Sequence, residues 1–182
     1  LDRRGRSGRS FVRGVGITRL CVRLFFLFGL SPMPCVSLQS PLGPLTVHEE
    51  DGLLTSLDWC WSKEQEETGL LSLMRDQLSD YFDGTLTDFS LPLAPAGTPF
   101  QHRVWSAMCH IPYGEVRSYG DIARQLKSGA RAVGMACGRN PLPIFIPCHR
   151  VVGADGTLTG YSGGDGLASK EYLLTHEGFE VV

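Results

Sequence analysis

A cysteine follows an apolar run and is followed directly by two residues that can influence its ionisation. Residues 140–147 end at Pro147, and Cys148, His149 and Arg150 come next. The thiolate is the nucleophilic form of cysteine, and a nearby base or positive charge favours its formation. A cysteine with a purely structural role needs no such neighbours. The sequence therefore predicts that Cys148 is an activated nucleophile.

Direct pairing of Cys148 with His149, as in a cysteine hydrolase, is a weaker interpretation. Side chains of adjacent residues usually diverge, and the sequence has no signature of an oxyanion hole. A metal site is not expected either, because the chain has no Cys-x-x-Cys pair and its other neighbouring cysteines and histidines lack zinc-ligand spacing. We predict neither a metal nor a cofactor.

Length and composition restrict the class of protein. The chain has 182 residues, enough for one ordinary domain or two small ones, and 42% of them are hydrophobic, enough for a real core. No apolar run approaches the ~20 residues of a membrane span, so we expect no membrane association. The six cysteines are too few in a chain of this size to indicate a disulfide framework. We expect a reducing, intracellular location, cytoplasmic or, in a eukaryote, nuclear.

The net charge of −2 conceals a strong asymmetry along the chain. Residues 1–35 contain seven arginines and one acidic residue, whereas residues 36–97 contain two basic and eleven acidic residues. Within residues 117–150 there are six basic side chains and one acidic one. This basic zone is either a solvated surface or the binding face for a polyanion.

Residues 1–35 differ in character from the rest of the chain. They are rich in arginine and glycine and then become apolar over residues 24–30. Such a segment fits a targeting sequence, or a start upstream of Met33 that is not native. We expect a disordered extension or a non-native start there, with the folded part beginning at residue 36.

Residues 36–97 have the pattern of a small α/β domain. Turn residues separate three strand-like segments, which predicts an antiparallel meander. The segments are residues 37–42, 45–48 and 53–61. Apolar residues then recur at helical spacing over 70–82, and residues 91–97 are rich in proline and glycine. We place a domain boundary after residue 97.

Residues 98–182 begin with a strong helix signal. Thr98 can cap, and Gln101 can complete a capping box. A short helix capped by Ser118 and a third helix over 130–138 follow, which is the outline of a helix-turn-helix. The third helix is rich in alanine and glycine. Such a thin helix fits close approach to a neighbouring helix or to a DNA groove, and the basic zone favours DNA.

The end of the chain contains a turn and a helix. Residues 153–156 predict a hairpin turn followed by a strand up to Tyr161. The last helix should direct Leu167, Leu173 and Leu174 inward and stop at residue 178. A carboxylate at Glu177 is disfavoured by the helix dipole, so either water or a specific partner must stabilise it.

Three segments together resemble the O6-alkylguanine-DNA alkyltransferases. They are residues 98–119, 130–141 and 146–178, and the last contains the specific run Pro-Cys-His-Arg-Val. The resemblance implies a mixed α/β (α+β) protein, with a small N-terminal α/β domain built on an antiparallel sheet. Its C-terminal domain would be winged helix-turn-helix-like. The helix over 130–138 would enter the DNA minor groove, which is only about 6 Å wide, and the target base would be flipped out of the stack.

The resemblance also implies an activity. A methyl or other alkyl group would move irreversibly from O6 of guanine to Cys148, once per protein molecule, and O4 of thymine is a second candidate target. The partner would be double-stranded DNA containing O6-alkylguanine, bound by a monomer without a cofactor. His149 would take the thiol proton through a water, and Glu177 would orient His149. Tyr119 would donate a proton toward the leaving base, and Asn140 would brace the active-site segment.

The DNA contacts are likewise implied by the resemblance. Arg131 would fill the space vacated by the flipped base, and Arg150 would be structural or face a phosphate. The remaining DNA- and base-binding residues would be Tyr119, Ala130, Gly134, Tyr161, Ser162 and Gly163.

Two departures from the family pattern and two further alternatives remain. The chain is about two residues shorter between Leu126 and Arg131 and lacks the usual proline there, and Asp165-Gly166 resembles an insertion in the active-site loop. A non-catalytic protein that binds alkylated DNA is one alternative, although such proteins carry another residue in place of Cys148. A fused transcriptional regulator is the other, although no additional Cys-rich domain is present.

Overall fold

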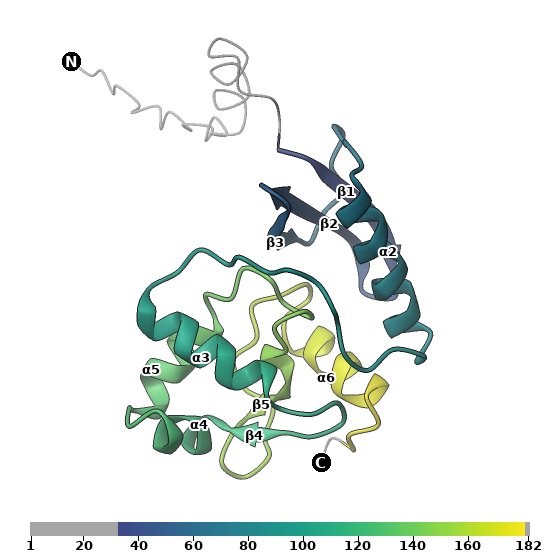
Figure 1. Ribbon diagram of the computed structural model, residues 1–182. Helices are drawn as coiled ribbons and strands as arrows, with labels where there is room; N and C mark the ends of the chain where they lie inside the picture. Colours follow the sequence, from purple (N-terminus) through teal and green to yellow (C-terminus); the bar gives the residue numbers. More distant parts are fainter. Residues whose placement is uncertain (1–32, 181–182) are drawn as a thin grey trace, which may run out of the picture. The chain divides into compact units, whose positions relative to one another are not determined.

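The computed structural model describes residues 33–180, and these belong to one compact unit (Figure 1). The extension expected over residues 1–35 therefore lies, up to residue 32, outside the described residues. The first strand, β1 (Cys35–Ser40), begins one residue before the expected boundary. No helix in this described range is both long and apolar enough to cross a membrane.

The predicted antiparallel meander is confirmed. β1 pairs with β2 (Gly43–Glu50), which pairs with β3 (Leu53–Asp58). Helix α2 (Gly69–Phe82) lies against this sheet (Figure 1) and begins where the Thr68 side chain accepts a hydrogen bond from the Leu71 amide. Its apolar stripe is buried, as the spacing predicts; the buried residues are Leu71, Met74, Leu78 and Tyr81.

The helices of the C-terminal half form where their capping residues predict. Helix α3 (Pro99–Cys109) starts with the complete Thr98–Gln101 capping box. Ser118 and Asp121 form a second capping box at the start of α4 (Tyr119–Gln125). Helix α5 (Ala130–Cys137) packs against both α3 and α4. The predicted pair of short helices joined by a tight turn is therefore present, and the fold belongs to the predicted mixed α/β class.

The segment after Cys148 differs from the expectation. β5 (Val151–Val152) pairs in parallel with β4 (Arg117–Ser118), and residues 157–161 form no strand. The turn itself is present, because the Gly153 amide donates to the Thr157 carbonyl at 2.9 Å. Beyond it, the Thr159 carbonyl accepts hydrogen bonds from the Lys170 ammonium (2.9 Å) and the Tyr119 hydroxyl (3.0 Å). The Thr159 carbonyl therefore bonds to side chains instead of to the backbone of a neighbouring strand.

Helix α6 (Leu167–His176) confirms two of its three predicted core residues. Leu173 and Leu174 are fully buried, but Leu167 is 47% exposed, so its predicted inward direction is wrong. Lys170, one turn later on the same side, is the residue that is buried instead. Gly178 ends the helix with φ 82°, a conformation that glycine adopts without strain.

Candidate active site

Cys148 begins a 3₁₀ turn, η1 (Cys148–Arg150), and is 8% exposed. The Asn140 side chain stabilises the preceding segment and also contacts the thiol. Its Nδ2 donates to the Ile146 carbonyl at 2.8 Å and lies 3.3 Å from Sγ of Cys148. Its Oδ1 accepts from the Leu142 amide at 3.1 Å. One amide thus fixes both the backbone before the cysteine and the position of its sulfur.

Glu177 is 4% exposed and has specific partners, so its carboxylate does not rely on water. Oε1 lies 2.7 Å from Nε2 of His149 and accepts from the Tyr81 hydroxyl at 2.8 Å. Arg150 donates from Nε to Oε2 at 2.8 Å and from Nη2 to Oε1 at 3.0 Å. The Gly114 amide adds a weaker contact to Oε2 at 3.3 Å. These donors stabilise the carboxylate at an otherwise unfavourable helix end.

Arg150 is therefore a structural residue, and the alternative that it faces a phosphate is wrong. It is 5% exposed, and its Nη1 donates to the Ile111 carbonyl at 2.7 Å. Its charge neutralises Glu177 inside the protein, since a buried carboxylate without a cation would be costly.

The charges of this network determine the state of His149. Burial would raise the pKa of Glu177, but the hydrogen bonds from His149 and Arg150, together with the charge of Arg150, outweigh it and lower the pKa to about 2. Burial lowers the pKa of His149, and the hydrogen bond to Glu177 opposes this only in part. His149 is thus neutral at pH 7, with the proton on Nε2 facing the carboxylate. Its Nδ1 is buried and has no hydrogen-bond partner among the described residues.

Cys148 itself is not ionised by its sequence neighbours. Burial raises the pKa of its thiol, and the Asn140 hydrogen bond and the Lys170 charge offset this only partly. Arg150, whose charge the sequence suggested would favour the thiolate, is directed at Glu177 instead. The neutral thiol therefore predominates at rest, so a base must remove its proton when the reaction occurs.

A pocket of about 270 Å³ opens beside Cys148. Two predicted site residues besides the cysteine and Asn140, namely Ser162 and Gly163, line it. The rest of the lining comes from residues 56–59, Cys137, Pro141 and Pro143. The pocket therefore lies between residues 56–59, at the end of β3, and the active-site turn.

Two tyrosines lie near this site. The Tyr119 hydroxyl donates to the carbonyls of Thr159 (3.0 Å) and Gly160 (3.3 Å), and burial raises its pKa to about 12. Burial also raises the pKa of Tyr161, whose hydroxyl has no partner in the described part of the chain. Both phenols are therefore protonated at neutral pH and can act as donors.

Two of the three predicted DNA-contacting residues of α5 lie at its exposed start. Ala130 and Arg131 are exposed, and neither lines the pocket beside Cys148. Gly134 faces Tyr119, because a methyl group on its Cα would lie 3.9 Å from the tyrosine ring. The structure thus places α5 next to the tyrosine but leaves its first residues free at the surface.

Both departures from the family pattern form tight turns. Lys127, in the short connection before α5, adopts φ 51°, and the Gly129 cap has no side-chain hydrogen bond. The Gly166 amide donates to the Gly163 carbonyl at 2.9 Å, and the Ser169 hydroxyl accepts from the Asp165 amide at 2.9 Å. The additional residues therefore lie at the start of α6, and neither lines the pocket beside Cys148.

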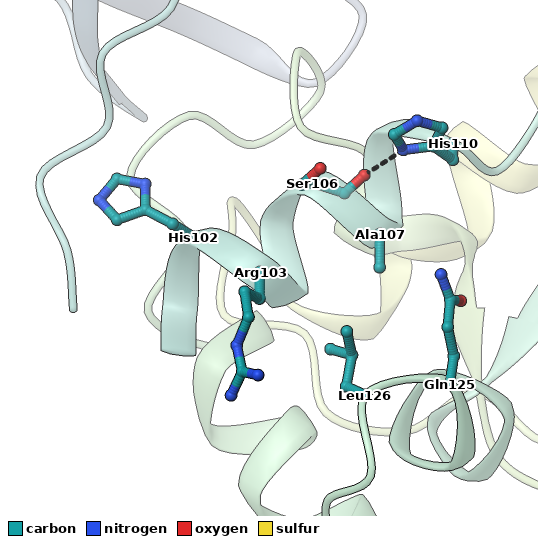
Figure 2. Close-up of a pocket in the computed structure, with 7 residues that line it drawn as sticks. All are labelled: His102, Arg103, Ser106, Ala107, His110, Gln125 and Leu126. Atoms are coloured by element: carbon teal, nitrogen blue, oxygen red, sulfur yellow. Dashed lines mark hydrogen bonds between the residues drawn. The ribbon is translucent and has the colours of Figure 1, made fainter. Parts of the chain in front are cut away.

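A second pocket, of about 510 Å³, lies between α3 and the end of α4 (Figure 2). It is lined by side chains such as His102, Arg103 and Gln125, and Nδ1 of His110 lies 2.6 Å from the Ser106 carbonyl within it. None of the predicted site residues lines it, so the chemistry is not located there.

Three residues at the site were not predicted as functional. Tyr81 belongs to the apolar stripe expected over residues 70–82, although a tyrosine in such a stripe needs a partner for its hydroxyl. Lys170 is completely buried, a rare environment for a lysine, and burial lowers its pKa to about 8. No sequence pattern indicates a role for Trp59, because only the tertiary fold brings the end of β3 beside Cys148.

Comparisons with known proteins cover both halves of the chain. Residues 99–179 match the DNA-binding domain of 6-O-methylguanine DNA methyltransferase, and residues 33–95 match the ribonuclease-like domain of the same family. The constitutive methylated-DNA–protein-cysteine methyltransferase of Bacillus subtilis (strain 168) is 49% identical over 152 residues, which cover 76% of this chain and 92% of that protein. The corresponding protein of Mycobacterium leprae (strain TN) is 45% identical over 157 residues, which cover 81% and 94%.

A solved structure is similar over most of the chain. The crystal structure of Mycobacterium tuberculosis OGT in complex with DNA superposes with a TM-score of 0.72 at 48% identity, covering 79% of this chain and 91% of that one. The cysteine turn and the buried His149–Glu177 pair lie within the residues that match the family's DNA-binding domain. Because both halves of the chain match, the chain belongs to the 6-O-methylguanine DNA methyltransferase family.

Proposed function

We propose that this protein repairs DNA by transferring a methyl or other alkyl group from O6 of guanine to its own Cys148. The observation that carries the proposal is a thiol held by Asn140 at the edge of a pocket, directly before a neutral histidine paired with a buried carboxylate. The relatives named above are methyltransferases from methylated DNA to a protein cysteine, which supports the same donor and acceptor here.

The transfer is a displacement at carbon. The Cys148 sulfur forms a bond to the alkyl carbon, the bond from that carbon to O6 breaks, and its electron pair remains on guanine. The proton lost from the thiol is balanced by a proton that the guanine gains. A thioether has no easy route back to a thiol, so each molecule reacts once. O4 of thymine is a second target with the same kind of leaving oxygen.

His149 and Glu177 supply the base for the thiol. Because Nε2 of His149 faces the carboxylate, Nδ1 carries the lone pair that can accept a proton. We assign it the thiol proton, relayed by one water, and assign Glu177 the orientation of the ring and the stabilisation of the imidazolium. Tyr81 and Arg150 hold Glu177 in place.

The leaving base and the DNA are assigned to the other predicted residues. The protonated Tyr119 donates toward guanine, and Tyr161, Ser162 and Gly163 form the wall against the base. Arg131 enters the stack when the base is flipped, and Ala130 and Gly134 allow α5 to approach the minor groove closely. We propose the division at residue 97 as the boundary between the two domains, and a monomer as the unit that binds double-stranded DNA.

The test is a mass measurement on the intact protein after incubation with a DNA duplex containing O6-methylguanine. We expect one added methyl group per molecule, located on Cys148 by peptide mapping and absent in Cys148→Ala. Cys60→Ala is the matched control, because Cys60 is an exposed cysteine that does not line the pocket. Many methyl groups removed per protein molecule, or duplex binding without any mass change, would contradict the proposal.

A further inference from the structure

The end of β3, together with the residue that follows it, closes the pocket beside Cys148. Leu57 and Trp59 both line it, and the Leu57 amide donates to the Pro141 carbonyl at 2.8 Å. This hydrogen bond ties the end of the strand to the segment that leads to the cysteine. The wall contributed by residues 56–59 is therefore fixed relative to the sulfur.

The ring of Trp59 fills the space over the active-site loop. A methyl group added to Gly163 would lie 2.7 Å from Cζ2 of Trp59, and one added to Gly164 would lie 3.1 Å from Cε3 and Cζ3. Contacts this short leave no room for side chains at either glycine. The indole thus lies directly on the loop and occupies volume that would otherwise extend the pocket.

The size of the pocket is informative. A methyl group is similar in size to a water molecule, whose share of liquid volume is about 30 Å³. The pocket is about 270 Å³ and has to hold the flipped guanine as well as its alkyl group. The room left for an alkyl group on O6 is therefore limited, and the wall contributed by residues 56–59 is one of its boundaries.

From these observations we propose that Trp59, contributed by the N-terminal half of the chain, sets the upper size limit of the alkyl group that Cys148 accepts. This rests on the proposed function and names a residue that determines its specificity. Small alkyl groups do not reach the indole, whereas a long or branched aromatic group is blocked by it. A mismatch of even one methylene in an apolar pocket changes selectivity about tenfold or more.

The experiment compares single-turnover rates on DNA duplexes that contain O6-methylguanine, O6-benzylguanine or O6-(4-phenylbenzyl)guanine. In Trp59→Ala we expect the ratio of the 4-phenylbenzyl rate to the methyl rate to rise by about tenfold, with a smaller rise in Trp59→Phe. Trp61→Ala is the matched control, because Trp61 is 50% exposed and does not line the pocket. Its ratio should stay within about twofold of the unmodified protein, since no contact with the alkyl group changes.

The outcomes separate the two proposals. A ratio of two rates in one preparation does not depend on how much of the protein is folded, so partial unfolding of a variant cannot produce the expected result. An unchanged ratio in Trp59→Ala, or an equal loss of rate on all three duplexes, would mean that Trp59 only supports the loop, and would overturn this inference. No methyl transfer by the unmodified protein would instead overturn the proposed function.

Discussion

Nε2 of His149 lies 2.7 Å from Oε1 of Glu177, and neither side chain has any exposed surface. The two residues are 28 positions apart in sequence, and the contact forms because α6 packs against η1. It fixes the tautomer of the histidine and places a negative charge where an imidazolium would form. The consequences of this contact can be measured.

Glu177→Gln should both destabilise the protein and stop the transfer. The substitution keeps the shape of the side chain but leaves the buried Arg150 without its anion, which costs about 3–5 kcal/mol in the free energy of unfolding. Urea denaturation and a single-turnover methyl-transfer assay measure the two effects. Glu171→Gln, on the exposed side of α6, is the control and should change neither quantity.

Stability should fall with decreasing pH in two stages. The pKa of His149 is lowered in the folded protein, so the unfolded chain binds a proton first as the pH drops below the ordinary histidine pKa of 6.5. The pKa of Glu177 falls from 4.5 to about 2 on folding, so its contribution is complete above pH 4.5 and is lost as the pH approaches 2. At about 1.4 kcal/mol per pKa unit, this second stage amounts to about 3 kcal/mol. Urea midpoints between pH 2 and 8 test it, and a flat profile would contradict the assignment.

Tyr81→Phe tests the link between α2 and the catalytic network. Removal of the hydroxyl takes away one donor to the buried carboxylate, which should cost about 1.5–3 kcal/mol of stability and slow the transfer less than Glu177→Gln does. Chemical denaturation and the transfer rate are the measurements. Tyr172→Phe is the matched control, because Tyr172 lies on the surface of α6 and its hydroxyl is not one of the donors to Glu177.

Asn140→Ala should shift the pH dependence of the reaction. Asn140 lowers the pKa of Cys148 through the hydrogen bond to its sulfur, so its loss moves thiol ionisation to higher pH. The transfer rate should rise with pH along a profile displaced to the alkaline side, and the loss of two backbone contacts should cost about 1–3 kcal/mol of stability. The absorbance of the thiolate during a pH titration provides an independent reading. Arg139→Ala is the control and should leave the pH profile in place. A profile that keeps its position in Asn140→Ala would contradict the role given to Asn140.

Arg131→Ala should separate DNA binding from chemistry. Loss of a side chain that replaces a flipped base should lower the rate on duplex DNA about tenfold or more, as the loss of one stacking contact does. The rate with the free base O6-benzylguanine should not change, since no stack has to be opened. Arg75→Ala, on α2, is the control. An equal loss on both substrates would indicate damage to the active site instead.

Local sequence patterns account for the secondary structure and point to Cys148 as the proposed nucleophile. Capping boxes, helical spacing and turn residues depend on side chains a few positions apart, so the helices after Thr98 and Ser118 and the meander over residues 35–58 follow from local pattern. The run around Cys148 is specific enough to identify the family. The position of Glu177 at a helix end also indicates that its carboxylate needs water or a specific partner, although it does not say which.

The contacts made by the neighbours of Cys148 depend on residues that come together only in the folded chain. Adjacency suggested that Arg150 would help to ionise the thiol, but side chains of consecutive residues diverge, and Arg150 neutralises Glu177 instead. Tyr81 and Trp59 reach the site because α2 and β3 belong to the same compact unit as η1, and no local pattern encodes contacts over such sequence distances. Burial, which raises the pKa of Cys148 and lowers that of His149, is likewise a property of the whole fold.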